Sequence, residues 1–167
     1  MSKTIIIMGS SRPMGDTYKV CKQLISENGY KFQDLTELVI MPFDYDYDNK
    51  DDDYMGFIKH VIDKYDNIIL ATPVYWYTMS GIMKNFVDRF TDLMTIQKEV
   101  GRRLRGKNLL YVSVSNSDDV PEEFQLPIKR TAEYLGMNFR GYRHFSINDD
   151  NNNSSNYAFV KEVIGNG

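Results

Sequence analysis

Residues 4–17, T-I-I-I-M-G-S-S-R-P-M-G-D-T, join an apolar run directly to a polar loop of small residues. The isoleucines at 5–7 form an unbroken β-branched run, which is typical of a strand buried on both faces of a parallel sheet. Apolar residues at helical spacing resume after Thr17. We therefore expect the loop to lie between the carboxyl end of a strand and the amino end of a helix.

This loop is a candidate anion site. At such a junction the first helical N–H groups have no partner and the helix dipole is positive, which favours a phosphate. Gly9 and Gly15 permit backbone angles that a β-carbon would hinder. The side chains that can donate hydrogen bonds to phosphate oxygens are Ser10, Ser11, Arg12 and Thr17.

Two common nucleotide-binding loops are excluded by the same residues. Asp16 stands where the lysine of a G-x-x-x-x-G-K-[ST] loop would be, and Ser11 and Pro13 break the spacing of G-x-G-x-x-G. The alternative to an anion site is a polar turn in which Thr17 or Asp16 caps the helix. Asp16 favours that alternative, because a carboxylate repels a phosphate unless it caps the helix or meets Arg12.

The composition is that of an ordinary globular protein. The 167 residues are 42% hydrophobic and 26% charged, and we expect one domain spanning residues 1–167. The net charge of −3 does not indicate a nucleic-acid partner. We find no signal-peptide pattern or run of about 20 apolar residues, so we expect a cytoplasmic protein without membrane contact. The single cysteine, Cys21, lies in a helical apolar stripe, and an intrachain disulfide is excluded.

Segments of strand and helix character alternate along the chain. We expect strands at 5–7, 32–40, 67–72, 109–115 and 137–147, and helices at 15–28, 54–65, 80–94, 121–135 and 157–164. Crossovers between parallel strands share one hand, so the helices cover both faces of the sheet. The predicted fold class is α/β: a three-layer sandwich with a five-stranded parallel sheet and helices on both faces.

Other polar stretches are expected to be solvated. Residues 44–53 alternate Asp with Tyr, without the glycine and terminal glutamate of a calcium loop, and residues 148–156 are almost all Asn, Asp and Ser. The basic run at 98–107 could attract the 2′-phosphate of NADPH, although a solvated connector is the simpler interpretation. His60 and His144 lack a second histidine at a ligand spacing, so we expect no metal site and treat both as surface or structural residues.

Residues 72–90, T-P-V-Y-W-Y-T-M-S-G-I-M-K-N-F-V-D-R-F, follow the third expected strand. In a strand order of 2-1-3-4-5, the loops after strands one and three flank the position where open α/β sheets bind ligands. Pro73 fixes the backbone direction, and the aromatic side chains that follow offer flat apolar surface. Tyr75, Trp76 and Tyr77 cannot all point to one face, so we expect at least one to meet a ligand or partner. The two loops together suit a phosphorylated, flat heterocycle.

These two stretches resemble the NAD(P)H-dependent FMN reductase family of the flavodoxin-like superfamily. Residues 9–17, G-S-S-R-P-M-G-D-T, are similar to the family's G-S-x-R-x-x-G-N-T loop, with Asp16 in place of the asparagine. Residues 72–76 with Ser80, Lys84, Asp88 and Arg89 are similar to its S-P-V-Y-W…S…K…D-R segment. The resemblance covers nearly the whole chain and implies a flavodoxin-like sheet of order 2-1-3-4-5.

The resemblance also implies a flavin site without a catalytic side chain or a metal. The phosphate of FMN would be surrounded by Ser10, Arg12, Gly15, Asp16 and Thr17, in the same loop as Ser11. The isoalloxazine ring would be bordered by Pro73, Val74, Tyr75, Trp76 and Tyr77. The family's third flavin loop follows strand four, where this chain has S-N-S-D at 115–118, so Ser115 is a candidate contact.

The implied activity is that of an FMN-dependent NAD(P)H oxidoreductase. NADPH or NADH would pass a hydride to bound FMN, and the reduced flavin would pass electrons to a small-molecule acceptor such as a quinone, a flavin, or an azo or nitro compound. The family also implies a homodimer.

Two alternative functions stay open. One is a flavodoxin-like electron carrier or flavin-binding regulatory protein without nicotinamide turnover, for which the acidic residues 44–53 could dock a partner. The other is a relative that has lost the flavin.

Overall fold

The computed structural model describes residues 3–165, with every side chain in that range except those of residues 150–152. In chain order the elements are β1 (Thr4–Met8), α1 (Asp16–Asn28), β2 (Lys31–Asp34), the 3₁₀-helix η1 (Leu35–Glu37), α2 (Asp53–Lys64), β3 (Asn67–Tyr75), β4 (Thr78–Met79), α3 (Gly81–Asp88), α4 (Phe90–Met94), α5 (Lys98–Arg102), β5 (Asn108–Ser115), the 3₁₀-helix η2 (Glu122–Gln125), α6 (Leu126–Leu135), β6 (Asn138–Ser146) and α7 (Asp150–Gly165). The predicted alternation of strands and helices is confirmed. Within residues 3–165, no helix is long and apolar enough to cross a membrane.

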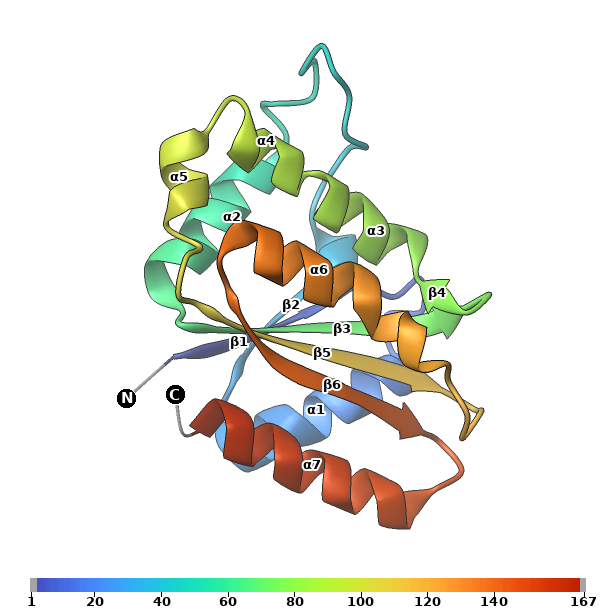
Figure 1. Ribbon diagram of the computed structural model, residues 1–167. Helices are drawn as coiled ribbons and strands as arrows, with labels where there is room; N and C mark the ends of the chain where they lie inside the picture. Colours follow the sequence, from blue (N-terminus) through green and yellow to red (C-terminus); the bar gives the residue numbers. More distant parts are fainter. Residues whose placement is uncertain (1–2, 166–167) are drawn as a thin grey trace.

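The sheet has the predicted flavodoxin-like order. Its parallel strands lie in the order β2-β1-β3-β5-β6, and the short β4 pairs antiparallel with β3 off this path. When only the parallel strands are numbered, this order is 2-1-3-4-5. Met8 at the end of β1 pairs with Ala71 in β3. The loops that follow these two strands therefore lie at the same end of the sheet, the end at which β4 is seen in Figure 1.

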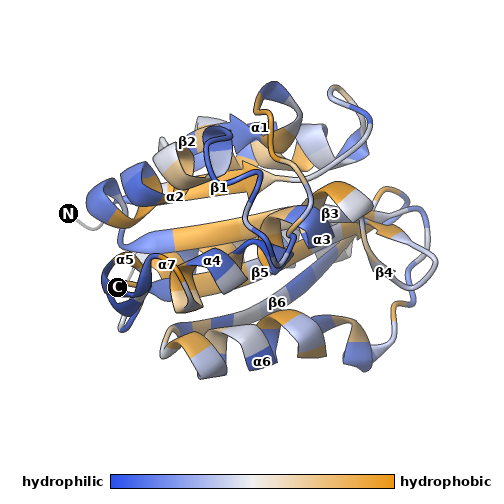
Figure 2. Cartoon of the chain, turned by 90° about the horizontal axis from the view of Figure 1, so that it is seen from above, coloured by the Kyte–Doolittle hydropathy of each residue, from blue (hydrophilic) through white to orange (hydrophobic). Residues whose placement is uncertain are grey.

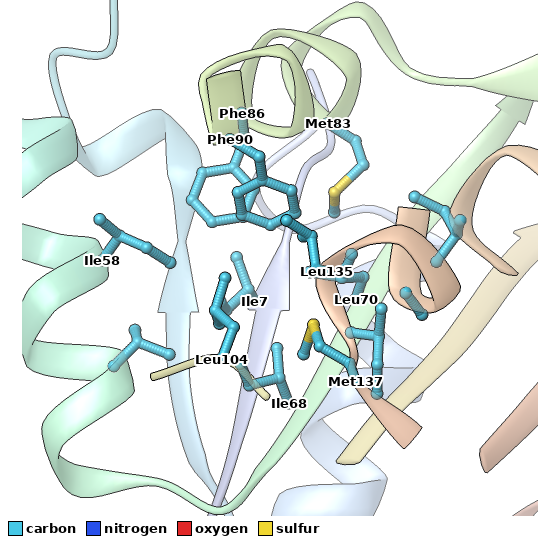
Figure 3. Packing of buried hydrophobic residues seen from close by; sticks show 14 of the residues in the cluster. Ile7, Ile58, Ile68, Leu70, Met83, Phe86, Phe90, Leu104, Leu135 and Met137 are labelled. Carbon is cyan, nitrogen blue, oxygen red and sulfur yellow. The ribbon is translucent and has the colours of Figure 1, made fainter. Parts of the chain in front are cut away.

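The central strands are apolar on both faces because successive side chains point in opposite directions. In β1, Ile5 and Ile7 face the layer that contains α2, α3, α4 and α6, whereas Ile6 and Met8 face α1 and α7. These two groups of helices lie on opposite sides of the sheet (Figure 1), and the central strands are coloured hydrophobic over most of their length (Figure 2). Figure 3 shows the first layer, where Phe86 packs above Ile7.

The second strand is shorter than predicted. The strand expected at 32–40 ends at Asp34, and η1 follows it. The Asp34 carboxylate accepts hydrogen bonds from the Thr36 N–H (2.9 Å) and the Thr36 hydroxyl (2.8 Å). Such a local bond offers the backbone an alternative to strand pairing, and the strand ends there.

The helix predicted at 80–94 is divided at Arg89 into α3 and α4. The Arg89 side chain is fully buried, and its guanidinium bonds the carboxylates of Asp52 (2.5 Å) and Asp92 (2.8 Å). Asp52 is the N-cap of α2 and also accepts a bond from the Met41 N–H (2.8 Å). Arg89 thus ties the loop at 41–52 to the body of the protein.

Two of the expected loops contain helix. α7 begins at Asp150, so most of the loop expected at 148–156 is helical, and the helix expected at 157–164 is only the second half of α7. The basic run at 98–107 contains α5 and precedes β5. It therefore lies at the opposite end of the sheet from the loops after β1 and β3 (Figure 1), which argues against a contact with their ligand.

Candidate functional site

A cavity of about 380 Å³ opens at the carboxyl ends of β1, β3 and β5. Four segments line it, namely the loop after β1 with the start of α1, the end of β3, the end of β5 and the residue after β6. The lining residues are Ser10, Arg12, Gly15, Asp16, Thr17, Pro73, Val74, Tyr75, Val114, Ser115, Asn116 and Ile147. The structure therefore brings together the two loops that the sequence predicted to share one ligand.

The loop after β1 is a tight turn. The Ser10 hydroxyl accepts a hydrogen bond from the Arg12 N–H (3.2 Å), and the Arg12 carbonyl accepts one from the Gly15 N–H (3.1 Å). A β-carbon on Gly15 would lie 3.0 Å from the β-carbon of Arg12. Ser10 is buried and Arg12 is exposed. The turn thus orders the backbone while leaving the guanidinium accessible to an anion.

The amino end of α1 faces the cavity. Gly15 is the N-cap residue, and no described side chain caps the helix, so neither Thr17 nor Asp16 takes the capping role that the alternative interpretation required. Asp16 meets Lys19 rather than Arg12, with 2.7 Å between Oδ1 and Nζ. The first-turn N–H groups, which lack intrahelical partners, are therefore available to a ligand.

The same loop packs closely on the start of α3. The Ser80 hydroxyl donates to the Gly9 carbonyl (2.6 Å) and accepts from the Met83 N–H (3.0 Å), so it caps α3. A β-carbon on Gly9 would lie 2.9 Å from the backbone nitrogen of Met83. Gly9 is therefore needed for the close approach of two backbones, a role that its place in the sequence did not reveal.

The aromatic stretch is divided between the cavity and the surface. Residues 73–75 line the cavity, and the Tyr75 hydroxyl lies 2.9 Å from the Ser11 hydroxyl, which links the two loops. Trp76 and Tyr77 form the turn between β3 and β4 with φ of 49° and 61°. Their side chains are 94% and 73% exposed and do not belong to the lining. The structure thus brings Tyr75, but not its two aromatic neighbours, to the cavity wall.

The end of β5 supplies the third segment. Ser115, the candidate contact from the sequence, lines the cavity together with Val114 and Asn116, and Ile147 joins them from the end of β6; the sequence did not single out these last three. These three residues stand at or next to the carboxyl ends of β5 and β6. Their position at the ends of predicted strands, where open α/β sheets bind ligands, could therefore have identified them from the sequence.

A histidine behind this segment holds it in place. His144 Nε2 lies 2.8 Å from the Ser117 carbonyl oxygen, and Nδ1 lies 2.8 Å from the Ser113 hydroxyl. Because a carbonyl only accepts, Nε2 carries the hydrogen and Nδ1 accepts from Ser113. Burial lowers the pKa of His144, which favours the neutral ring that these bonds need. Of the two roles expected for His144, surface or structural, its hydrogen bonds support the structural one.

The sequence is similar to a known protein family and to two curated proteins. The model of a family described as NADPH-dependent FMN reductase matches residues 2–152. YwqN of Bacillus subtilis (strain 168), named as a candidate NAD(P)H-dependent FMN-containing oxidoreductase, is 30% identical over 97 residues, which cover 54% of this chain and 52% of YwqN. The NADPH azoreductase of Bacillus sp. (strain OY1-2) is 26% identical over 98 residues, which cover 59% of this chain and 55% of the azoreductase. The alignments thus span about half the length of these curated relatives.

A solved structure shares the whole fold. The Trp repressor binding protein from Bacillus subtilis superposes with a TM-score of 0.72 at 21% identity, covering 95% of this chain and 97% of that chain. At this identity the likeness shows the fold alone.

Proposed function

This chain belongs to the NADPH-dependent FMN reductase family, whose cofactor is FMN, and we propose that it is an FMN-dependent NAD(P)H oxidoreductase. The observation that carries the proposal is the cavity shared by the loop after β1 and the end of β3, which are joined by the Ser11–Tyr75 hydrogen bond. One end of that cavity offers N–H groups, hydroxyls and a cation. The other end offers apolar surface, so the cavity matches a molecule with an anionic end and a flat ring end.

The amino end of α1 fits the phosphate of FMN. The helix end has no side-chain cap, and Ser10 and Thr17 line the cavity beside it. Arg12 adds a charged donor from the exposed side. The residues proposed to surround the phosphate are Ser10, Ser11, Arg12, Gly15, Asp16 and Thr17, with Asp16 contributing its backbone N–H at the first turn of α1.

The apolar end of the cavity suits the ring. We assign the ring contacts to residues 73–75, to residues 114–116 and to Ile147, with Trp76 and Tyr77 at the rim. When bound, FMN supplies the redox chemistry, taking a hydride from the nicotinamide and passing electrons to a second acceptor. The chain's own residues bind and orient the ring, and no side-chain acid or base is assigned.

The second acceptor is proposed to be a small conjugated molecule. The relative named as an NADPH azoreductase supports the azo class, and quinones, flavins and nitro compounds share the same flat, electron-accepting chemistry.

Stopped-flow mixing of the FMN-loaded protein with NADPH and with NADH tests the first half-reaction, the reduction of bound FMN by the nicotinamide. We expect the flavin absorbance to bleach with at least one nicotinamide. Bound flavin that neither nicotinamide bleaches would refute the reductase proposal.

The assembly proposed is a homodimer of one-domain chains in the cytoplasm. Two large apolar side chains that are close in sequence to lining residues are exposed, Met14 at 81% and Trp76 at 94%. A second subunit that covers them would remove them from water. Sedimentation equilibrium tests the dimer, and a monomeric mass at micromolar concentration would contradict it.

A second candidate function is an electron carrier that accepts electrons from a partner protein. The acidic stretch at 44–53 favours it as a docking surface, because Asp46, Asp48 and Asp51 are exposed and Tyr45 is 86% exposed. This alternative predicts flavin reduction by a partner protein that weakens steeply with salt, without NAD(P)H oxidation.

A further inference from the structure

Asp16 is an acidic residue that lines the cavity where the loop after β1 joins α1. It is the first residue of α1, and it lines both this cavity and a second hollow between α1 and α7. Lys19, one turn further along, lines only the second hollow and bonds Asp16 at 2.7 Å. Asp16 is therefore held by a cation that lies on the side away from the main cavity.

This arrangement affects an anionic ligand in two opposite ways. Without a ligand, the carboxylate suits the positive end of the helix dipole, so Asp16 takes the place of an anion there. A phosphate dianion at the same end meets the charge of Asp16 and competes with it for the same dipole. The Asp16–Lys19 pair reduces that repulsion, because Lys19 neutralises the carboxylate at close range.

We propose, resting on the function proposed above, that Asp16 weakens the hold of this loop on the FMN phosphate and that Lys19 offsets part of the weakening. The protein then holds FMN as a dissociable ligand, more loosely than a loop with a neutral residue at position 16 would. The effect acts on the phosphate and not on the ring. Riboflavin, which has the same ring without the phosphate, is therefore the matched ligand.

The test is a titration of the flavin-free, full-length protein with FMN and with riboflavin, followed by the quenching of flavin fluorescence. Asp16→Asn is expected to raise the affinity for FMN about tenfold and to leave that for riboflavin within about twofold. Glu27→Gln, which removes one negative charge from the other end of α1, is expected to change neither affinity. The gain from Asp16→Asn should shrink at high salt.

Lys19 is tested in the same way. Lys19→Gln is expected to lower FMN affinity several-fold, whereas Lys22→Gln, which removes an exposed cation of the same helix, is expected to have a smaller effect.

A second measurement concerns Asp16. The variant Asp16→Asn should lower the melting temperature of the flavin-free protein, because the carboxylate no longer interacts with the helix dipole, and it should retain more FMN through gel filtration. A substitution that merely made the loop more rigid would raise both the melting temperature of the flavin-free protein and the amount of FMN that is retained.

The outcomes separate this inference from the proposed function. If Asp16→Asn leaves FMN affinity unchanged or lowers it, or if FMN and riboflavin affinities shift together, the inference is wrong although the protein is a flavoprotein. If the wild-type protein binds neither flavin, the proposed function fails and the inference fails with it.

Discussion

Gly9 shows how much of the site depends on single residues. The substitution Gly9→Ala would put a β-carbon within 2.9 Å of the Met83 backbone, so either β1 or α3 must shift. We expect a loss of about 1–3 kcal/mol in the free energy of unfolding, as for overpacked sites, and a lower affinity for FMN. Urea unfolding and flavin titration measure the two effects.

Gly56→Ala is the matched control for that substitution. Gly56 lies within α2, and a β-carbon there would meet nothing within 4 Å. Alanine is the better helix former, so we expect a gain of about 0.5–1 kcal/mol. If Gly9→Ala and Gly56→Ala both stabilised the protein, the close approach of the Met83 backbone would not explain why position 9 is glycine.

The turn of the β3–β4 hairpin contains residues that disfavour its backbone conformation. Trp76 and Tyr77 both have positive φ, whereas such two-residue turns favour Asn-Gly. The double variant Trp76→Asn/Tyr77→Gly is expected to raise the free energy of unfolding by about 1–3 kcal/mol because it relieves this strain. It should also weaken flavin binding, because it removes the two aromatic side chains that we propose lie at the rim of the cavity. Tyr47→Gly, at another residue with positive φ, should leave flavin affinity unchanged.

The junction of α3 and α4 depends on a buried cation. Arg89 bonds Asp52, Asp92 and the Met41 carbonyl (3.0 Å), so its removal leaves buried carboxylates without a counter-charge. Arg89→Met is expected to cost about 3–5 kcal/mol and to open residues 41–52 to proteases. Arg89→Lys, which keeps the charge, should lose less. By contrast, Lys84→Met breaks only an exposed pair on α3 and should cost less than about 1 kcal/mol.

At the scale of the whole molecule, the strand order and the meeting of two loops followed from local patterns. An apolar run that ends in a loop marks a strand followed by a helix; the loop has small polar residues at 4–17 and aromatic residues at 67–81. What escaped prediction depends on partners distant in sequence. Periodicity treats an arginine as exposed, so it could not reveal that Arg89 is buried against Asp52. The polar residues at 148–156 read as a loop because their own composition is unfavourable for a helix, although α7 packs on β6.

The packing of the whole molecule also sets its response to high pH. Tyr54 and Tyr111 are fully buried, and neither hydroxyl has a hydrogen-bond partner among the described residues. Burial raises the pKa of both side chains. An unfolded tyrosine ionises near pH 10, so the unfolded state releases these protons first as the pH rises. Stability should therefore fall above about pH 10, by about 1.4 kcal/mol per buried tyrosine at pH 11.

Tyr111→Phe tests this origin directly. The hydroxyl makes no bond, so the variant should be at least as stable as the wild type at pH 7, and the stacking on Phe124 (5.5 Å between ring centroids) is kept. Its advantage should grow by about 1.4 kcal/mol between pH 7 and pH 11, because only the wild type has this proton to lose on unfolding. Tyr134→Phe, at a residue 77% exposed, should show no such growth. Urea unfolding at the two pH values measures both, and a constant difference for Tyr111→Phe would mean that this tyrosine ionises alike in the folded and unfolded states.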